Sequence, residues 1–209
     1  MALLEHYYTR FEEERIYHIY NRSVDRKPLF KNSQNYAFFM KKYLEYLFPV
    51  LETYCYSLSR DHFNFLVKVK DLTTFKKLSN LPENKKAHEI VSHHFRKFFQ
   101  SYSMAFNKQH NRIGTLFQTP FKRVLIDDHA FLRKVVFYIH ANPQFHELID
   151  DFQDWKWSSY YPISHNLSHK LNDEEMFEWF GSKDKFIQLH QETFRLKANF
   201  NESYFCQAD

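Results

Sequence analysis

The sequence predicts an α+β fold in which helices pack on an antiparallel sheet, and three observations lead to it. Short runs rich in β-branched and aromatic residues alternate with longer stretches whose apolar residues recur at helical spacing. Two of the short runs are separated only by Arg60 and Asp61, which indicates a hairpin with a tight polar turn. The resulting order, β-α-β-β-α-β-α, is that of a ferredoxin-like antiparallel sheet with one further helix.

Each expected element has a local reason. The run 15–24 is rich in Ile and Tyr and is expected to form the first strand, which Pro28 breaks. Asn32 is a candidate N-cap for a first helix that Pro49 ends. Asp128 stands where an acidic residue favours a helix N-terminus. The other expected elements are strands at 53–59, 62–70 and 121–126, a helix from Pro82 to Asn107, and a helix at 128–142 that Pro143 ends.

A small helical appendage is expected after the main domain. The main domain comprises residues 1–163, and the appendage comprises residues 164–209. The appendage begins with a polar stretch and continues with two short helical segments, 173–180 and 183–196, which Gly181 separates.

The composition excludes several kinds of site. The chain has two glycines, Gly114 and Gly181, where an average usage near 7% would give about fourteen. A P-loop, a dinucleotide-binding turn and a kinase phosphate loop each need several closely spaced glycines, so none of them is present. Cys55 and Cys206 are too few for a disulfide framework or a cysteine zinc site.

The sequence indicates a cytoplasmic protein. Residues 1–15 alternate apolar with charged side chains and lack the apolar centre of a signal peptide. No apolar run approaches the roughly 18 residues that a membrane-spanning helix needs. We therefore expect no membrane partner.

Charge and aromatic content leave two interpretations open. The net charge of +4 and the pI of about 8.9 are compatible with a polyanionic partner. Phe, Tyr and Trp together make up 20% of the chain. These rings either fill the core or stack on unpaired bases at the surface.

Four polar side chains are expected to meet between one strand and one helix. His62 and Asn64 are two residues apart on a strand, so they point to the same face. Tyr138 and Asn142 are four residues apart and share one side of a helix. If that helix crosses the sheet near His62, the imidazole and two amide oxygens can hold a divalent metal while the phenol attacks a phosphodiester. A hydrogen-bonded polar patch is the other interpretation.

Several stretches are similar to motifs of a known family. Residues 111–122 read Asn-Arg-Ile-Gly-Thr-Leu-Phe-Gln-Thr-Pro-Phe-Lys, and residues 138–143 read Tyr-Ile-His-Ala-Asn-Pro. Together with Tyr-His-Ile-Tyr-Asn-Arg at 17–22 and Asp-His-Phe-Asn-Phe-Leu-Val at 61–67, they occur in the order expected for that family. In these motifs the chain resembles the REP-associated tyrosine transposases, which are single-tyrosine HUH transposases related to the small insertion-sequence transposases that move single-stranded DNA.

The resemblance implies a role for each matching position. Tyr138 stands at the place of the nucleophile, which becomes linked to a DNA 5′-phosphate and leaves a free 3′-hydroxyl. His62 corresponds to the first metal-binding histidine and Asn142 to an amide ligand one turn after the tyrosine. The implied cofactor is Mg²⁺ or Mn²⁺, and the implied partner is single-stranded or hairpin DNA.

Two positions depart from the family pattern. Asn64 replaces the second histidine of the metal site, and Ser23 replaces a glycine at the end of the first strand. An amide oxygen still binds a hard cation but is a weaker donor to transition metals than imidazole. The change is expected to lower metal affinity or to favour Mg²⁺.

Basic and polar residues suggest where the DNA binds. Arginines and lysines neutralise phosphates, and Phe117 and Phe121, which lie among them, are able to stack on unpaired bases. A solvated basic face over the core is the alternative. With the positions that the resemblance adds, the candidate DNA-binding residues are Asn21, Arg22, Arg26, Arg112, Gln118, Lys122 and Arg123.

The sequence therefore predicts a metal-dependent single-strand DNA endonuclease and strand transferase. The alternative is a domesticated protein of the same fold that binds structured single strands without cleaving them. A third possibility is a protein whose aromatic surface mediates protein assembly. Formation of a homodimer is left open.

Overall fold

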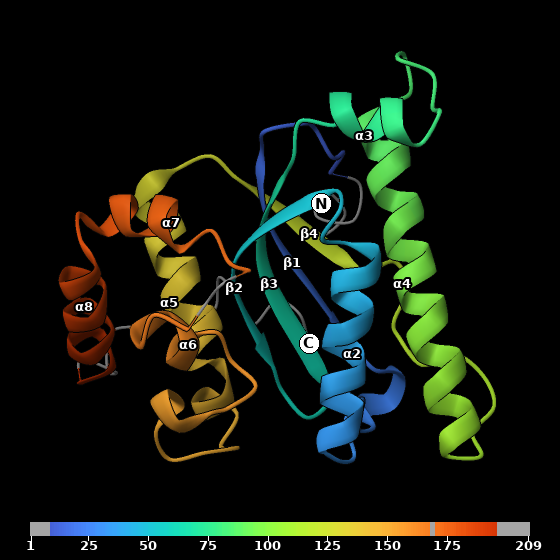
Figure 1. Ribbon diagram of the computed structural model, residues 1–209. Coiled ribbons are helices and arrows are strands. Elements are labelled where there is room, and N and C mark those ends of the chain that lie inside the picture. Colours follow the sequence, from blue (N-terminus) through green and yellow to red (C-terminus); the bar gives the residue numbers. More distant parts are fainter. Residues whose placement is uncertain (1–8, 168–169, 196–209) are drawn as a thin grey trace, which may run out of the picture.

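A four-stranded antiparallel sheet lies between two layers of helices (Figure 1). The computed structural model describes residues 9–167 and 170–195. In the sheet the strands follow the order β2-β3-β1-β4. Their bounds are Ile16–Arg22 for β1, Leu51–Leu58 for β2, His62–Val69 for β3 and Lys122–Ile126 for β4. The predicted α+β class with an antiparallel sheet is confirmed.

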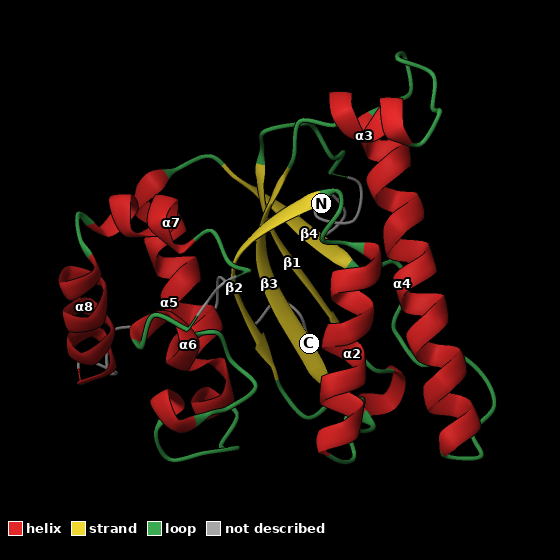
Figure 2. Ribbon diagram, viewed as in Figure 1, coloured by secondary structure: helices red, strands yellow, loops and turns green. Residues whose placement is uncertain are grey.

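Helices cover both faces of the sheet (Figure 2). On one face lie α2 (Ser33–Tyr46) and α4 (Ala87–Gln109), and the other face is covered by α5 (His129–Phe145). The remaining helices are α3 (Thr73–Leu78), which precedes α4, and α6 (Tyr160–Ser164), α7 (Asp173–Phe180) and α8 (Lys183–Arg195), which lie on the α5 side. Two short 3-10 turns, Val24–Arg26 and Phe152–Asp154, complete the elements of the described residues. None of the helices in the described ranges is long and apolar enough to cross a membrane.

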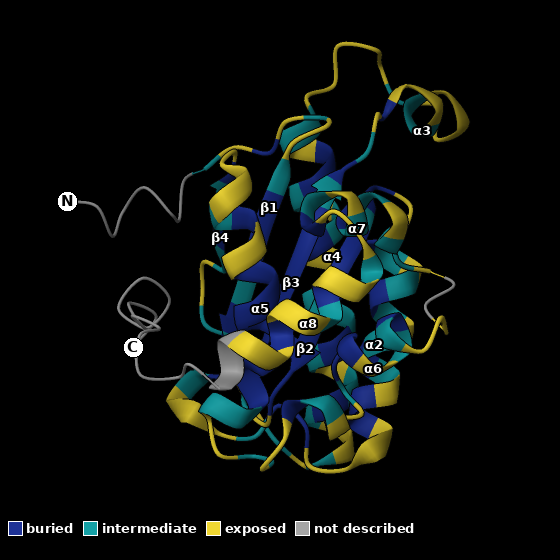
Figure 3. Cartoon of the chain, turned by 90° about the vertical axis from the view of Figure 1, so that its left-hand side faces the viewer, coloured by how far each residue is buried: buried dark blue, intermediate teal, exposed yellow. Residues whose placement is uncertain are grey.

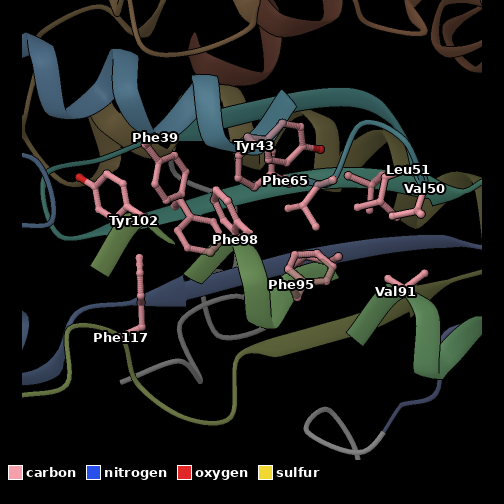
Figure 4. Close-up of a cluster of buried hydrophobic side chains, with 14 of the residues drawn as sticks. Phe39, Tyr43, Val50, Leu51, Phe65, Val91, Phe95, Phe98, Tyr102 and Phe117 are labelled. Atoms are coloured by element: carbon pink, nitrogen blue, oxygen red, sulfur yellow. The ribbon is translucent and has the colours of Figure 1, made fainter. Parts of the chain in front are cut away.

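Most of the aromatic residues fill the core, which supports the first of the two interpretations above. Phe39 and Tyr43 of α2 pack on Phe65 of β3, and the rings of Tyr43 and Phe65 stack at 4.3 Å (Figure 4). Phe98 and Tyr102 of α4 meet Phe39 edge to face at 4.8 and 4.9 Å. On the other side, β2 and β3 are almost entirely buried behind α5 and the C-terminal helices (Figure 3).

The strand register decides which residues face α5. In the β1–β3 pair, Tyr20 lies opposite Asn64 and Arg22 lies opposite His62. Directly opposite residues of an antiparallel pair project to the same face. The ring of His18, two residues before Tyr20, packs against Tyr138 of α5. The alternate residues His18, Tyr20 and Arg22 of β1 and His62 and Asn64 of β3 therefore share the face that α5 covers.

Local capping explains where two helices begin. The Asn32 side chain accepts a hydrogen bond from Asn35 N at 3.0 Å, as expected of an N-cap. The Asp128 carboxylate accepts from the backbone N–H groups of Ala130 and Phe131. These two bonds satisfy donors that the first turn of α5 leaves unpaired.

The prediction that Pro143 ends the last helix of the main domain was wrong. The helix continues through Pro143 to Phe145. Proline lacks only one backbone N–H, and the helix ends two residues later, so the cost is confined to its last turn. The long helix also begins at Ala87, later than predicted, because residues 82–85 form a turn in which the Lys85 N–H donates to the Pro82 carbonyl oxygen at 3.0 Å.

The C-terminal helices are attached to α5 by a buried histidine pair. His190 of α8 donates from Nδ1 to the carbonyl oxygen of Phe186 at 2.8 Å, so its Nε2 is an acceptor. His140 of α5 donates to that Nε2 from its own Nδ1 at 3.0 Å. The Nε2 atom of His140 lies 2.9 Å from the Ser159 hydroxyl. Both imidazoles are neutral in this chain when the Ser159 hydroxyl donates to His140 Nε2 and not to the Tyr56 carbonyl oxygen, 3.1 Å from it.

This pair makes stability depend on pH. Burial lowers the pKa of His190 to about 4, so below pH 6.5 the unfolded chain takes up a proton that the folded chain does not. Between pH 7 and pH 5 the free energy of unfolding should therefore fall by about 2 kcal/mol more in the wild type than in His190→Gln. Urea titrations at both pH values measure the difference.

The control for this measurement is His165→Gln, because His165 is exposed and the chemical change is the same. Between pH 7 and pH 5, the free energy of unfolding of His165→Gln should fall by as much as that of the wild type. Equal losses in the wild type and in His190→Gln would contradict the assignment.

Cys55 is buried and carries a free thiol. Cys206 and the end of the predicted appendage lie outside the described residues. The division of the chain at residue 163 stays a prediction.

Candidate functional site

Three of the four predicted side chains form one hydrogen-bonded chain between β3 and α5. His62 Nε2 lies 2.8 Å from Asn142 Oδ1, and Asn142 Nδ2 donates to the Tyr138 hydroxyl at 3.4 Å. Asn142 is fully buried, and Tyr138 is 8% exposed. Because α5 packs across β2 and β3, the four-residue spacing of Tyr138 and Asn142 directs both toward the start of β3.

A carboxylate holds the other nitrogen of His62. The Nδ1 atom lies 2.7 Å from Asp61 Oδ1. Partial burial raises the pKa of Asp61, but the hydrogen bond and the charge of His62 outweigh burial and keep this pKa below its usual value. An ionised carboxylate only accepts hydrogen bonds, so Nδ1 carries a proton. Metal-binding histidines are commonly oriented by a carboxylate in this way.

The atoms His62 Nε2 and Asn142 Oδ1 fit a shared cation. The Asn142 oxygen already accepts a hydrogen bond from the Ser59 hydroxyl at 2.7 Å. In a neutral His62, Nε2 presents a lone pair to this oxygen, and two acceptors at such a distance repel each other. A proton on Nε2, a divalent cation bound by both atoms or a turn of the Asn142 amide removes the repulsion. Within residues 9–167 and 170–195 no three His, Cys, Asp or Glu side chains form a metal cluster, so a site here depends on amide oxygen.

Asn64 bonds to the neighbouring strand instead of to His62. Its Oδ1 accepts a hydrogen bond from His18 Nε2 at 2.9 Å, and the side chain is 2% exposed. Burial lowers the pKa of His18 to about 4, against the opposing effect of the Asn64 bond, so His18 is neutral at pH 7. His18 also packs edge to face on Tyr138 at 6.1 Å. His18, Asp61 and Ser59 were not among the predicted site residues; a histidine within an apolar strand was the available signal for His18.

Two of the candidate DNA-binding residues lie beside this site. Arg22 stands opposite His62 at the end of β1, and its positive charge lowers the pKa of Asp61 further. Lys122 of β4 stands opposite Tyr20, and its Nζ lies 5.7 Å above that ring. Both positions are on the face of the sheet that α5 covers.

The other candidates have structural contacts elsewhere. The Arg123 guanidinium packs over the rings of Phe11 and Phe121 and donates to the carbonyl oxygen of Thr9, on the α2 and α4 side of the sheet. Asn21 and Gln118 link the end of β1 to the loop before β4: the Asn21 side chain donates to the Gln118 carbonyl oxygen, and the Gln118 backbone N–H donates to the Arg22 carbonyl oxygen. Arg112 donates to carbonyl oxygens of its own loop, at Gly114 and Thr115. Arg26 is exposed in the turn after β1.

Comparison with known proteins gives a fold relationship. No family model and no curated protein sequence matches the chain. Among solved structures, the chain shares its α+β fold with a transposase. That protein is a REP-associated tyrosine transposase bound to a REP hairpin, with a TM-score of 0.56 and 15% sequence identity. The similarity covers 76% of this chain and 84% of that chain.

Proposed function

We propose that this chain is a single-strand DNA endonuclease and strand transferase of the REP-associated tyrosine transposase type, built on a ferredoxin-like sheet. The observation that carries the proposal is the position of Asn142, whose amide contacts the Tyr138 hydroxyl with one end and His62 with the other. The contact of the Tyr138 hydroxyl with a residue that shares a pair of atoms suited to Mg²⁺ or Mn²⁺ supports Tyr138 as the nucleophile. The fold shared with a hairpin-bound transposase supports DNA as the substrate class.

The side chains of the site suggest the course of the reaction. The Tyr138 oxygen attacks the phosphorus and its hydroxyl gives up a proton, while the bond from phosphorus to the 3′ oxygen breaks. That oxygen takes up one proton and leaves as a free 3′-hydroxyl, so the step consumes and releases no net proton. Asn142 donates to the phenol oxygen and so stabilises it as negative charge develops there. A divalent cation bound by His62 and Asn142 would supply Lewis-acid stabilisation of the phosphate oxygens. Arg22 and Lys122 hold the flanking phosphates by their charge.

A second function, binding of structured single strands without cleavage, is favoured by one observation. The residue in the place of the second metal-binding histidine is Asn64, and its oxygen is already bonded to His18. A site that holds its cation too weakly would bind DNA without cutting it.

The experiment that separates the two functions uses a hairpin oligonucleotide labelled at its 3′ end. With Mg²⁺ or Mn²⁺ present, the label should migrate with the protein on a denaturing gel, because the tyrosine bonds to the 5′-phosphate of the downstream fragment. EDTA added before the DNA should prevent formation of the adduct. Salt-dependent binding of the hairpin with no adduct under either metal would contradict the nuclease and select the binding protein.

A further inference from the structure

The candidate metal site lacks a second imidazole on the sheet. Asn64 occupies that position, and its carboxamide oxygen accepts the His18 hydrogen bond at 2.9 Å within a buried environment. The Asn64 oxygen bonds to His18 of the neighbouring strand, whereas the Asn142 oxygen lies 2.8 Å from His62 Nε2, so Asn142 and not Asn64 is placed to share a cation with His62. His62 and Asn142 alone would leave the cation with two protein ligands.

A different histidine lies against His62. His146 directly follows α5, four residues after Asn142 and eight residues after Tyr138, so successive turns bring these residues to one side of the helix. The ring centres of His62 and His146 are 4.5 Å apart, and the ring planes make an angle of 67°. His146 is exposed, whereas Asn142 is fully buried. A second imidazole therefore lies against His62 at the end of the helix.

The spacing of the two rings suits a shared ion. With metal–nitrogen bonds of about 2.0–2.2 Å, two imidazoles at right angles around one ion have ring centres about 4.5–5 Å apart. The backbone helps to hold His146 in place, because its N–H donates to the Asn142 carbonyl oxygen at 3.1 Å. One short segment thus carries the nucleophile, the amide ligand and the imidazole.

We propose that His146 is the third ligand of the divalent cation, so that the protein ligand set is His62, Asn142 and His146 and does not include Asn64. The inference rests on the proposed function for the presence of a cation. Two imidazoles and one amide oxygen favour Mn²⁺ over Mg²⁺, and the remaining coordination positions stay open for phosphate oxygens.

Calorimetric titration of Mn²⁺ into the DNA-free chain of 209 residues tests the assignment. His146→Ala should weaken Mn²⁺ binding by about tenfold or more, a loss of the size that changes around metal sites produce. Asn64→Ala should change the affinity by less than about threefold, as should the control His129→Ala, which removes an exposed histidine at the start of α5. Thermal melting of each variant confirms that it is folded.

Three results would overturn the inference: a wild type that binds no Mn²⁺, a His146→Ala affinity equal to that of the wild type, or an Asn64→Ala loss as large as that of His62→Ala. The outcome is separate from that of the proposed function. If Mn²⁺ binding depends on His146 but no DNA adduct forms, the ligand set stands and the nuclease activity does not. If the adduct forms but Mn²⁺ binding does not depend on His146, the nuclease activity stands and the proposed ligand set does not.

Discussion

Replacement of Tyr138 by phenylalanine is expected to abolish the covalent protein–DNA adduct, a fall of at least about a thousandfold in the rate of its formation. The variant loses only the attacking oxygen. The ring keeps its packing against His18 and Phe145, and the lost hydrogen bond from Asn142 is long, at 3.4 Å. The free energy of unfolding should therefore change by less than about 1 kcal/mol. The 3′-labelled hairpin assay on a denaturing gel measures the effect.

The matched control for this variant is Tyr160→Phe. Tyr160 is also buried, and its hydroxyl makes one long hydrogen bond, to Gln153 at 3.4 Å. The Tyr160→Phe variant should form the adduct at the wild-type rate. An undiminished adduct in Tyr138→Phe would remove Tyr138 from the role of nucleophile, whereas hairpin binding by that variant should persist, since the phosphate-binding positions are unchanged.

The largest expected loss of stability follows Phe39→Ala. Phe39 is fully buried between the sheet and α4, with the ring centres of Phe98 and Tyr102 within 4.9 Å of its own (Figure 4). The ring centre of Phe30 lies 5.1 Å away. Truncation removes these contacts and leaves a cavity that close-packed aromatic neighbours fill poorly. The free energy of unfolding should fall by about 3–5 kcal/mol, which is a large share of the roughly 5–15 kcal/mol of a typical domain.

Urea unfolding followed by circular dichroism measures this loss, and two further variants calibrate it. Phe39→Leu keeps most of the volume and should cost less than half as much. Leu78→Ala removes an apolar side chain that is 81% exposed and should change stability by no more than about 0.5 kcal/mol. A loss in Phe39→Ala as small as that in Leu78→Ala would show that the aromatic cluster contributes little.

Much of the fold could be predicted because its signals are local. The Asn32 cap and the turn at Arg60 and Asp61 depend on residues that are neighbours in the sequence. The prediction that the helix ends at Pro143 failed because the outcome there depends on tertiary packing and not on neighbouring residues in the sequence. The helix tolerates the proline because Asn142, Tyr138 and their neighbours on α5 are packed against the sheet, and tertiary packing outweighs one lost backbone bond.

The candidate site shows the same division. The pairing of Tyr138 with Asn142 follows from helical spacing, and the alternation of strand residues places His62 on one face. No local pattern could show that Asn64 bonds to His18, or that the ring of His146 lies beside that of His62. The same is true of Arg123, whose charge suggested a phosphate contact but whose guanidinium packs on Phe11.

The amino-acid sequence by itself determined the order of helices and strands, the kinds of chemical group on each, and the motifs that resemble a transposase family. Only the tertiary structure decided which of those groups meet. The physical reason is that spacing along a helix or strand is set by backbone geometry, which each short segment carries in itself. Contacts between segments depend on strand register and on how α5 packs across the sheet, and burial of the whole core fixes both.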